Sequence, residues 1–374
     1  MQRTILTCTV AALLGTISRG SEGDPSPVVP VDAIRAAVAK RFETLEAPGA
    51  VFGIFHGAER KPVLVMTLGH ADQEKSRPIQ RNDHFRIASI TKSFVGVTVL
   101  RMVDDGRIKL DDPIAKYVKG VPNGDRITIE MLGFHTSGLP RVIANRDFQK
   151  AIVAEPGRVW KTEEILAYAW KMSTLFEPGK SWMYSNTNTI LLGAVIEAVT
   201  GKPWHAEVRK QVLEPLKLEN TGFPADDRLP SPSPRGYRFG KKDNLIRYGD
   251  FWFDATDWSG SCWGAAGNMY GTLDDIAVFT RAVARGELVS EKSRKILFRW
   301  INTGYDQIEY GFHIARRQGV IGHTGDVPGY SSMAVYDPKR DLTIVSMANL
   351  SATRTKLTAA SELAELTVKL LQKG

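Results

Sequence analysis

Hydrophobic and polar residues alternate near both ends of the chain, which is the pattern of strands that lay one face on a core. Two short runs rich in β-branched residues, 49–55 and 62–68, predict an antiparallel pair of strands. Alternation returns near the C-terminus, where a Pro-containing turn at residues 337–341 joins the last two runs. These C-terminal runs are residues 311–318, 329–337 and 342–348.

Helical spacing of apolar residues occupies much of the remaining chain. It predicts a first helix over residues 31–45, with Asp32 near its start, and a last helix over residues 355–372. From about residue 110 to 285 the signals are mostly helical and are interrupted by Pro and Gly loops. The clearest helices in this stretch are residues 163–172 and 187–200.

Strands at both ends with helices between them predict the fold class. We expect an α/β protein of the α+β type, with one antiparallel sheet built from both chain ends and flanked by helices. A mostly helical lobe, residues 110–285, would be inserted between the two parts of the α/β lobe, residues 31–109 and 286–374. Together they would form one domain over residues 31–374, with a ligand site in the cleft between the lobes.

The composition is that of a globular protein, except at the N-terminus. Of the 374 residues, 43% are hydrophobic and 24% charged, and this length is enough for a large core. Arg3 precedes an apolar run, and a small-residue pattern ends at Gly20, so residues 1–20 are predicted to be a cleaved signal peptide. A lipid-modified Cys8 is the alternative. Residues 21–30 form a Pro- and Ser-rich linker.

These features predict a secreted or periplasmic protein with no stable membrane anchor, because no other stretch approaches the roughly 20 apolar residues of a membrane helix. Without its leader the chain would keep only Cys262, so its stability would come from its core rather than from disulfides. The formal net charge of +8 favours anionic cell-wall polymers as a partner, or else reflects a solvated surface without one.

Several classes of function are disfavoured by the sequence. The basic and acidic residues are interspersed, and no nucleic-acid-binding motif is present, so no nucleic-acid partner is expected. The seven histidines are scattered, with no His-Glu-x-x-His pattern and no cysteine pair, so neither a metal nor a cofactor is implied.

Three short motifs carry the candidate chemistry, and they occur far apart and in a fixed order. They are Ser89-Ile90-Thr91-Lys92, Tyr184-Ser185-Asn186 and His323-Thr324-Gly325. Each is weak alone. A serine hydroxyl needs an adjacent base to become a nucleophile, and a lysine one helical turn later lies on the same face. The three motifs together predict a serine acyl-transfer site.

The residue types suit separate roles in such a site. If Ser89 opens a helix that runs to about residue 105, free N–H groups at the helix start would stabilise an oxyanion, while a desolvated Lys92 would serve as the base. The Tyr184 phenol would relay a proton to the leaving group, and Asn186 would donate to a substrate amide and orient Lys92. The alternative is that Ser89 is only a helix cap and Lys92 a solvated charge, which three coinciding motifs disfavour.

With these motifs the sequence resembles the penicillin-recognising serine hydrolases, in which Ser-x-x-Lys is shared by β-lactamases and penicillin-binding proteins. The resemblance runs from about Pro30 to the C-terminus. Within this superfamily, the chain most resembles the secreted serine D-Ala-D-Ala carboxypeptidases and alkaline D-peptidases. Class C β-lactamases and related bacterial esterases are next. Supporting segments are residues 132–140, 176–182 and 267–272.

The resemblance implies roles for the third motif. Thr324 and Gly325 would lie on a strand edge along which a substrate backbone adds as a further strand. The N–H groups of Ser89 and Asp326 would form the oxyanion hole. His323 stands where β-lactamases usually have lysine, and it would supply positive charge only when protonated, so activity would change near its pKa.

Asp326 and the aromatic residues from Phe251 to Trp263 leave alternatives open. The Asp326 carboxylate would repel the terminal carboxylate of a D-Ala-D-Ala peptide by about 1 kcal/mol or more if the two were close. Alternatively, Asp326 faces solvent or pairs with an arginine. The aromatic stretch would either wall the pocket or pack in the core, and His135 is interpreted as structural.

We therefore expect a secreted serine hydrolase that acts through an acyl-enzyme on Ser89. Its substrate would be a small molecule or a peptide, and a D-Ala-D-Ala carboxypeptidase or D-peptidase fits best. A β-lactamase-related esterase or weak β-lactamase would use the same nucleophile on an ester or a β-lactam. A binding protein that holds peptides or β-lactams without turnover is the rival of another class, although it would not need Ser89, Lys92 and Tyr184 together.

Overall fold

The computed structural model describes residues 29–58, 61–224, 226–241, 249–305, 307–351, 353 and 357–373. The predicted signal peptide and most of the predicted linker lie outside this part of the chain. Among the described residues, no helix combines the length and the apolar character needed to cross a membrane.

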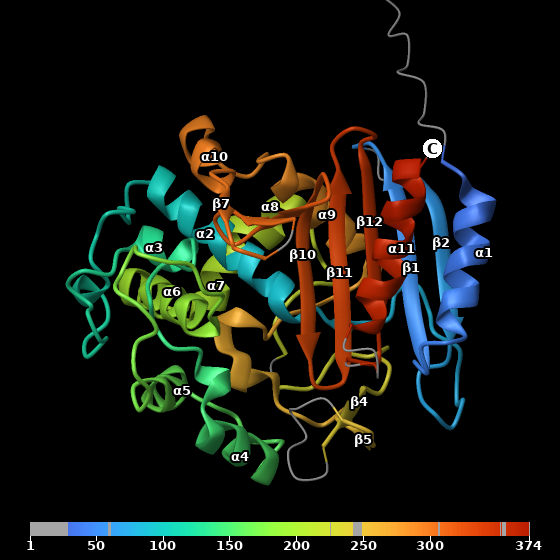
Figure 1. Cartoon of the computed structure of the whole chain (residues 1–374), viewed down its shortest axis with the longest axis horizontal. Helices are drawn as coiled ribbons and strands as arrows, with labels where there is room; N and C mark the ends of the chain where they lie inside the picture. The colour runs from blue at the N-terminus through green and yellow to red at the C-terminus, as the bar shows by residue number, and fades with distance from the viewer. Residues whose placement is uncertain are drawn as a thin grey trace, which may run out of the picture.

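One antiparallel sheet organises the molecule, and it is built from both ends of the chain (Figure 1). In the described residues it has eight strands in the order β2-β1-β12-β11-β10-β9-β8-β7. They are β1 (Gly49–His56), β2 (Lys61–Gly69), β7 (Ile301–Asn302), β8 (Ile308–Tyr310), β9 (Ala315–Arg317), β10 (Val320–Val327), β11 (Tyr330–Asp337) and β12 (Leu342–Ala348). Because β1 pairs with β12, the N-terminal hairpin extends a C-terminal sheet, and the predicted fold class is confirmed.

The predicted strands agree with the observed ones except in one place. β12 has the predicted limits, β1 and β11 differ from them by one residue at one end, and β2 is one residue longer at both ends. The prediction of a single strand over residues 311–318 is wrong, since Gly311–Ile314 turns between β8 and β9. His313 adopts a left-handed φ of 57° in this turn, a conformation that ends a strand whatever the hydrophobic pattern.

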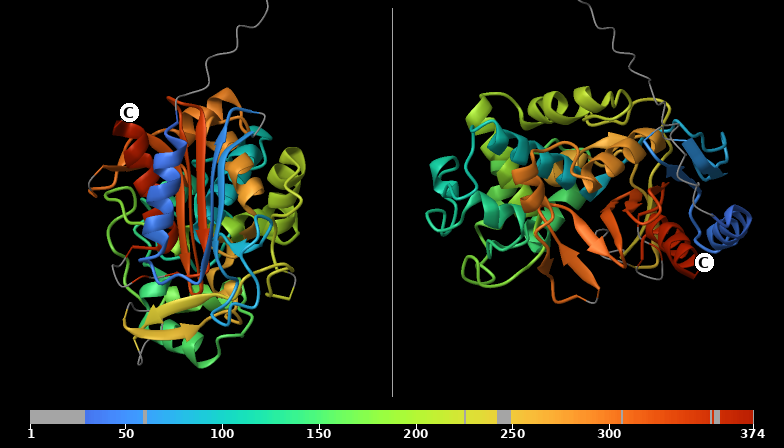
Figure 2. Two further views of the ribbon diagram at one scale, coloured as in Figure 1. Left: turned by 90° about the vertical axis from the view of Figure 1, so that its right-hand side faces the viewer. Right: turned by 90° about the horizontal axis from the view of Figure 1, so that it is seen from above.

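The central strands are buried on both faces, which explains their nearly continuous apolar sequences. Along β1, Phe52 and Ile54 contribute to one hydrophobic cluster, while Val51 and Phe55 contribute to another. The first cluster lies under two helices from the chain ends, α1 (Val31–Phe42) and α11 (Ala359–Lys373), and the second lies on the opposite face. Figure 2 shows the sheet between these two layers.

The second layer contains α2 (Thr91–Asp104), which runs between the sheet and the helical lobe, and α9 (Leu273–Ala284), which packs against β11 and β12. The predicted helical lobe, residues 110–285, included α9. Because α9 packs against the sheet, we propose that the helical lobe ends before Leu273. The remaining helices are α3 (Ile129–Gly133), α4 (Arg146–Ala154), α5 (Thr162–Ala169), α6 (Asn186–Thr200), α7 (Trp204–Val208), α8 (Glu214–Leu216) and α10 (Glu291–Leu297).

Two small sheets were not predicted. One joins β3 (Phe85–Arg86) to β6 (Tyr270–Gly271), and the other joins β4 (Tyr237–Gly240) to β5 (Phe251–Asp254). Short helical turns complete the fold: η1 (Ala88–Ile90), η2 (Ile114–Lys116), η3 (Val142–Ala144), η4 (Arg209–Leu213) and η5 (Gly260–Ala266).

The turn η1 lies directly against β10, and Gly325 makes this approach possible. A Cβ atom at Gly325 would lie 2.3 Å from the Ile87 carbonyl oxygen and 2.9 Å from the Ala88 Cβ, closer than real contacts allow. On the next strand, Ser332 Oγ donates to the same Ile87 oxygen at 2.9 Å. The glycine of the third motif is therefore needed for contact with the Ser89 turn, and not only for the approach of a substrate.

We expect Gly325→Ala to lower the free energy of unfolding by roughly 1–3 kcal/mol, because the added methyl group overpacks this contact. Urea denaturation would measure the loss. Gly157→Ala is the matched control, since its Cβ would have only one neighbour, at 3.7 Å, and its φ lies outside the left-handed region. Equal stability of the two variants would contradict the assigned role of Gly325.

Candidate active site

Ser89 lies in η1, two residues before α2 begins, rather than at the first residue of the helix as expected. The turn still carries Lys92 to the same side. Lys92 Nζ lies 2.9 Å from Ser89 Oγ and donates a hydrogen bond of 2.6 Å to the carbonyl oxygen of Ala266 in η5. The two side chains of the first motif are therefore in direct contact.

Lys92 is fully buried, and burial lowers the pKa of its amine well below the usual range. Both of its hydrogen-bond partners are uncharged groups. A neutral amine suits this environment: one N–H is directed at the Ala266 oxygen, and the nitrogen lone pair is left for the Ser89 hydroxyl proton. The geometry is that of a base next to a hydroxyl nucleophile.

Tyr184 precedes α6, and its ring centroid lies 5.0 Å from Lys92 Nζ. Burial raises the pKa of the phenol, while a hydrogen bond with Ser89 and the charge of Arg141 oppose that shift. The phenol therefore keeps its proton at neutral pH and suits a proton donor. His135 packs beside it with the ring centroids 4.7 Å apart, and its Nδ1 lies 2.9 Å from the side-chain nitrogen of Asn188.

Asn186 is the first residue of α6, and its Oδ1 is buried without a hydrogen-bond partner in the described part of the chain. The expected contact that would orient Lys92 is not among the hydrogen bonds of the Lys92 amine, which Ala266 holds instead. Asn186 therefore presents an unused acceptor to the pocket.

The third motif lies on β10, and its histidine is held in one tautomer. His323 Nδ1 lies 2.6 Å from the Thr324 carbonyl oxygen, and Nε2 lies 2.9 Å from the Tyr310 hydroxyl. The carbonyl only accepts, so Nδ1 carries the proton and Tyr310 donates to Nε2. Burial, followed by the charge of Lys92, lowers the pKa of His323 to about 4. The positive charge that a protonated His323 was expected to supply would therefore be present only in acid, well below the usual range of a histidine.

Asp326 pairs with an arginine, which was one of the two alternatives. Its Oδ1 lies 3.6 Å from the Arg238 guanidinium, whose side chain is 5% exposed against 29% for Asp326. Arg238 also donates to Ser351 Oγ at 3.0 Å. The nearby cation offsets the repulsion that Asp326 was expected to exert on a substrate carboxylate.

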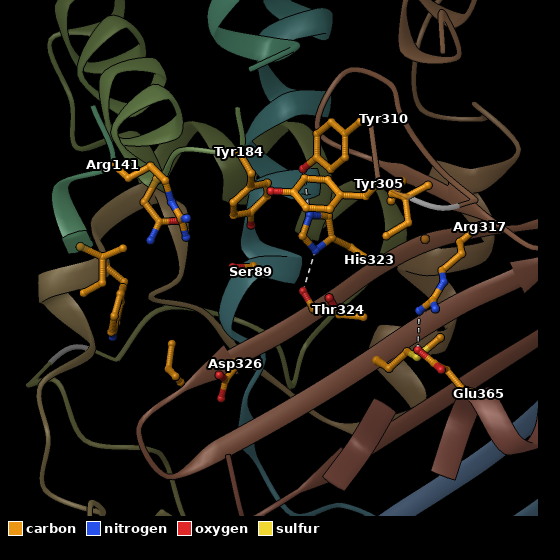
Figure 3. Close-up of a pocket in the computed structure, with 18 of the residues that line it drawn as sticks. Ser89, Arg141, Tyr184, Tyr305, Tyr310, Arg317, His323, Thr324, Asp326 and Glu365 are labelled. Carbon is orange, nitrogen blue, oxygen red and sulfur yellow. Dashed lines mark hydrogen bonds and ion pairs between the residues drawn. The ribbon is translucent and has the colours of Figure 1, made fainter. Parts of the chain in front are cut away.

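One pocket of about 520 Å³ lies beside the free edge of β10, and the predicted site residues that line it are Ser89, Tyr184, Asn186, His323, Thr324 and Asp326 (Figure 3). Within the described strands, β9 pairs with β10 only over Val320–Gly322, so the strand is open from His323 onward. The lining residues that the motifs did not predict are Arg141, Ile143, Trp182, Arg238, Tyr305, Ile308, Tyr310, Ala315, Arg317, Gly322, Val327, Pro328, Met333 and Glu365.

The aromatic stretch follows the two predicted fates only in part. Trp263 lines the pocket, Trp258 and Cys262 are buried in the core, and Phe251 is 44% exposed on β5. Among the described residues, no cluster of three or more His, Cys, Asp or Glu side chains could hold a metal ion.

Comparison with known proteins agrees with this geometry. A model of the Beta-lactamase family matches residues 34–369. Penicillin-binding protein 4* of Bacillus subtilis (strain 168) is 26% identical over 338 residues, which cover 82% of this chain and 70% of that protein. Protein flp of Staphylococcus aureus (strain N315) is 23% identical over 303 residues, with 78% of this chain covered, and the chain spans 58% of the length of flp.

Among solved structures, a D-stereospecific amidohydrolase from Streptomyces sp. has a TM-score of 0.78 to this chain at 28% identity. The match covers 90% of this chain and 98% of the amidohydrolase chain. The sheet, the helical lobe and their order along the chain are therefore those of a β-lactamase-type fold.

His323 should make the stability depend on pH. Its pKa is about 4 in the folded chain against a usual 6.5, so the unfolded state binds more protons between these values. The stability that its neutral form contributes is present above pH 6.5 and is lost as the pH falls toward 4, up to about 3 kcal/mol. His323→Gln should remove this part of the slope in urea denaturation at pH 7 and pH 4.5. An unchanged slope would contradict the assignment.

Proposed function

Since the chain belongs to the Beta-lactamase family of penicillin-recognising serine hydrolases, we propose that it cleaves amide bonds of D-amino-acid substrates through an acyl-enzyme on Ser89. In this proposal it acts as a D-peptidase or as a D-Ala-D-Ala carboxypeptidase. The observation that carries the proposal is the contact of 2.9 Å between the buried Lys92 amine and the Ser89 hydroxyl.

The first step forms the acyl-enzyme. Lys92 takes the hydroxyl proton while Ser89 Oγ attacks the substrate carbonyl carbon, and the negative charge on the carbonyl oxygen is stabilised by the N–H groups of Ser89 and Asp326. Tyr184 then gives its proton to the leaving nitrogen as the carbon–nitrogen bond breaks, and it regains a proton from Lys92. This order needs a neutral amine and a protonated phenol, and their pKa shifts favour those states.

A water molecule completes the cycle by attacking the ester on Ser89. Lys92, which is again neutral, accepts the proton of that water, and the same proton path returns it to Ser89 Oγ as the acid is released. Lys92 and Tyr184 therefore act in both halves of the reaction.

Four observations support a D-residue peptide or amide as the substrate. The open edge of β10 offers backbone groups to an added strand, and Asn186 offers an unused acceptor. Trp182, Trp263 and Tyr305 give the pocket aromatic walls suited to an apolar substrate group. The Streptomyces neighbour is a D-stereospecific amidohydrolase by its name.

The pairing of Asp326 with Arg238 supports the carboxypeptidase activity, because Arg238 balances the negative charge of the Asp326 carboxylate on β10. Esters and β-lactams would use the same nucleophile and the same proton path. The competing activities would therefore differ in how fast each acyl group is transferred to Ser89 and hydrolysed from it, and not in the residues of the site. A protein that only binds its ligand would gain nothing from the neutral Lys92 beside Ser89.

Mass spectrometry after incubation with a D-Ala-D-Ala peptide, a D-amino-acid amide, penicillin and an activated ester tests the proposal. We expect a transient acyl adduct on Ser89 with the D-substrates and the release of their products, and a longer-lived adduct with penicillin. Ser89→Ala should form no adduct and should keep its fold. Turnover of the ester alone would replace the proposed activity by that of an esterase, and adducts without turnover would indicate a binding protein.

Lys92→Ala and Tyr184→Phe should each slow acylation by roughly two to four powers of ten, the usual range for proton-transfer groups. Because both side chains serve one proton path, the double variant should be much less impaired than the product of the two single effects. Stopped-flow acylation rates with an activated substrate would measure all three variants. Multiplicative effects would show that the two residues act independently.

A further inference from the structure

The charged side chains of the pocket are paired, with one exception. Three arginines and two carboxylates line it. Arg238 faces Asp326 at 3.6 Å, and Arg317 forms an ion pair of 2.6 Å with Glu365. Within the described part of the chain, the guanidinium of Arg141 makes neither an ion pair nor a hydrogen bond. The pocket therefore has an excess of one positive charge, and it is located at Arg141.

The backbone around Arg141 is fixed by the start of α6. The Thr187 hydroxyl donates to the Pro140 carbonyl oxygen at 2.6 Å and accepts from the Val142 N–H at 3.1 Å. The two bonds lie on either side of Arg141 and hold its Cα in place. Its side chain reaches into the pocket from the helical lobe (Figure 3).

Arg141 lies beside the reacting groups. In Figure 3, Arg141 is on one side of Ser89 and Tyr184, and His323 and Thr324 are on the other. The charge of Arg141 also acts on the Tyr184 phenol.

A second observation points to a ligand at the same wall. Asn186 also belongs to the helical lobe, and its Oδ1 is a buried acceptor without a partner. An unused acceptor and an unused cationic donor in one pocket match a ligand that presents an N–H group and a carboxylate. Arginine binds carboxylates in a two-pronged geometry, which adds direction to the charge attraction.

We propose that Arg141 selects substrates whose acyl portion carries a carboxylate, such as an acidic D-residue, D-glutamate or D-aspartate, on the acyl side of the scissile bond. This inference rests on the proposed acyl transfer at Ser89. It places the carboxylate of the substrate's acyl portion on the helical-lobe side of Ser89. This side is away from β10 and from Asp326, which is paired with Arg238. In this arrangement Arg141 sets specificity and takes no part in the proton path.

Two substrates that differ in one group test the inference. The α-p-nitroanilides of D-glutamate and D-glutamine share a leaving group and differ by a carboxylate against a carboxamide. The native chain should prefer the glutamate compound in kcat/KM by about tenfold or more, the usual effect of one hydrogen-bonded charge pair. Arg141→Gln should bring this ratio close to one. Any effect of Arg141 on Tyr184 acts on both substrates and cancels in the ratio.

Arg146→Gln is the matched control, because it removes the same charge five residues away, from an exposed position outside the pocket. It should keep the native ratio. A native ratio of one, or a ratio that Arg141→Gln leaves unchanged, would overturn the inference while hydrolysis of both compounds still supported the proposed function.

A second measurement separates the two ideas if neither anilide is cleaved. Arylboronic acids form tetrahedral adducts with an active serine, so calorimetry can compare a carboxylate-bearing compound with its carboxamide analogue without turnover. The carboxylate compound should bind about tenfold more tightly to the native chain, and Arg141→Gln should abolish the difference. If the carboxylate compound binds more tightly and neither anilide is cleaved, Arg141 binds an anion but the proposed D-amide activity is wrong. Equal binding of the two boronic acids would show that Arg141 does not form an anion site.

Discussion

The burial of the Lys92 amine among uncharged partners sets the electrostatics of the whole site. Its two hydrogen-bond partners are a hydroxyl and a carbonyl oxygen, and the residue is inaccessible to water. A charged ammonium would lose its hydration there with no carboxylate among those partners to compensate, so the neutral form is favoured. Desolvation by the fold therefore favours the neutral amine that the proposed base requires, and the surrounding elements need only keep water away from one nitrogen.

The same constraint extends to the neighbouring imidazoles. Burial lowers the pKa of His135, His313 and His323, and the charge that Lys92 would carry is a further cause in all three. His135 and His323 lie beside Tyr184, and His313 packs against His135, while the arginines that line the pocket carry its positive charge. In this arrangement His323 contributes hydrogen bonds, and positive charge in the pocket is supplied from other elements.

The sequence predicted what depends on local geometry or on motif order, and it did not predict what depends on distant pairing. One helical turn fixes the contact between Ser89 and Lys92, so their spacing was informative. The partner of Asp326, in contrast, is Arg238 on β4, a strand that the sequence did not predict. No local pattern marks an ion pair between residues 88 positions apart. Arg141 was missed for a similar reason, since an arginine after a Pro resembles any solvated side chain until the fold places it in the pocket.

Three residues around the same groups have a strained backbone. Ala88, His135 and His313 all adopt left-handed φ values, of 49°, 59° and 57°, although none is glycine. Such conformations cost on the order of 1–3 kcal/mol each and persist only where packing and hydrogen bonds outweigh the cost. Here the Ser93 hydroxyl donates to the His313 carbonyl oxygen at 2.7 Å, and β10 lies against Ala88. The close approach of β10 to Ala88 at Gly325 therefore has a role besides packing. It holds a strained turn next to the strand, so that Ser89 reaches its position beside Lys92 before any substrate arrives, which is the preorganisation that catalysis by fixed dipoles requires.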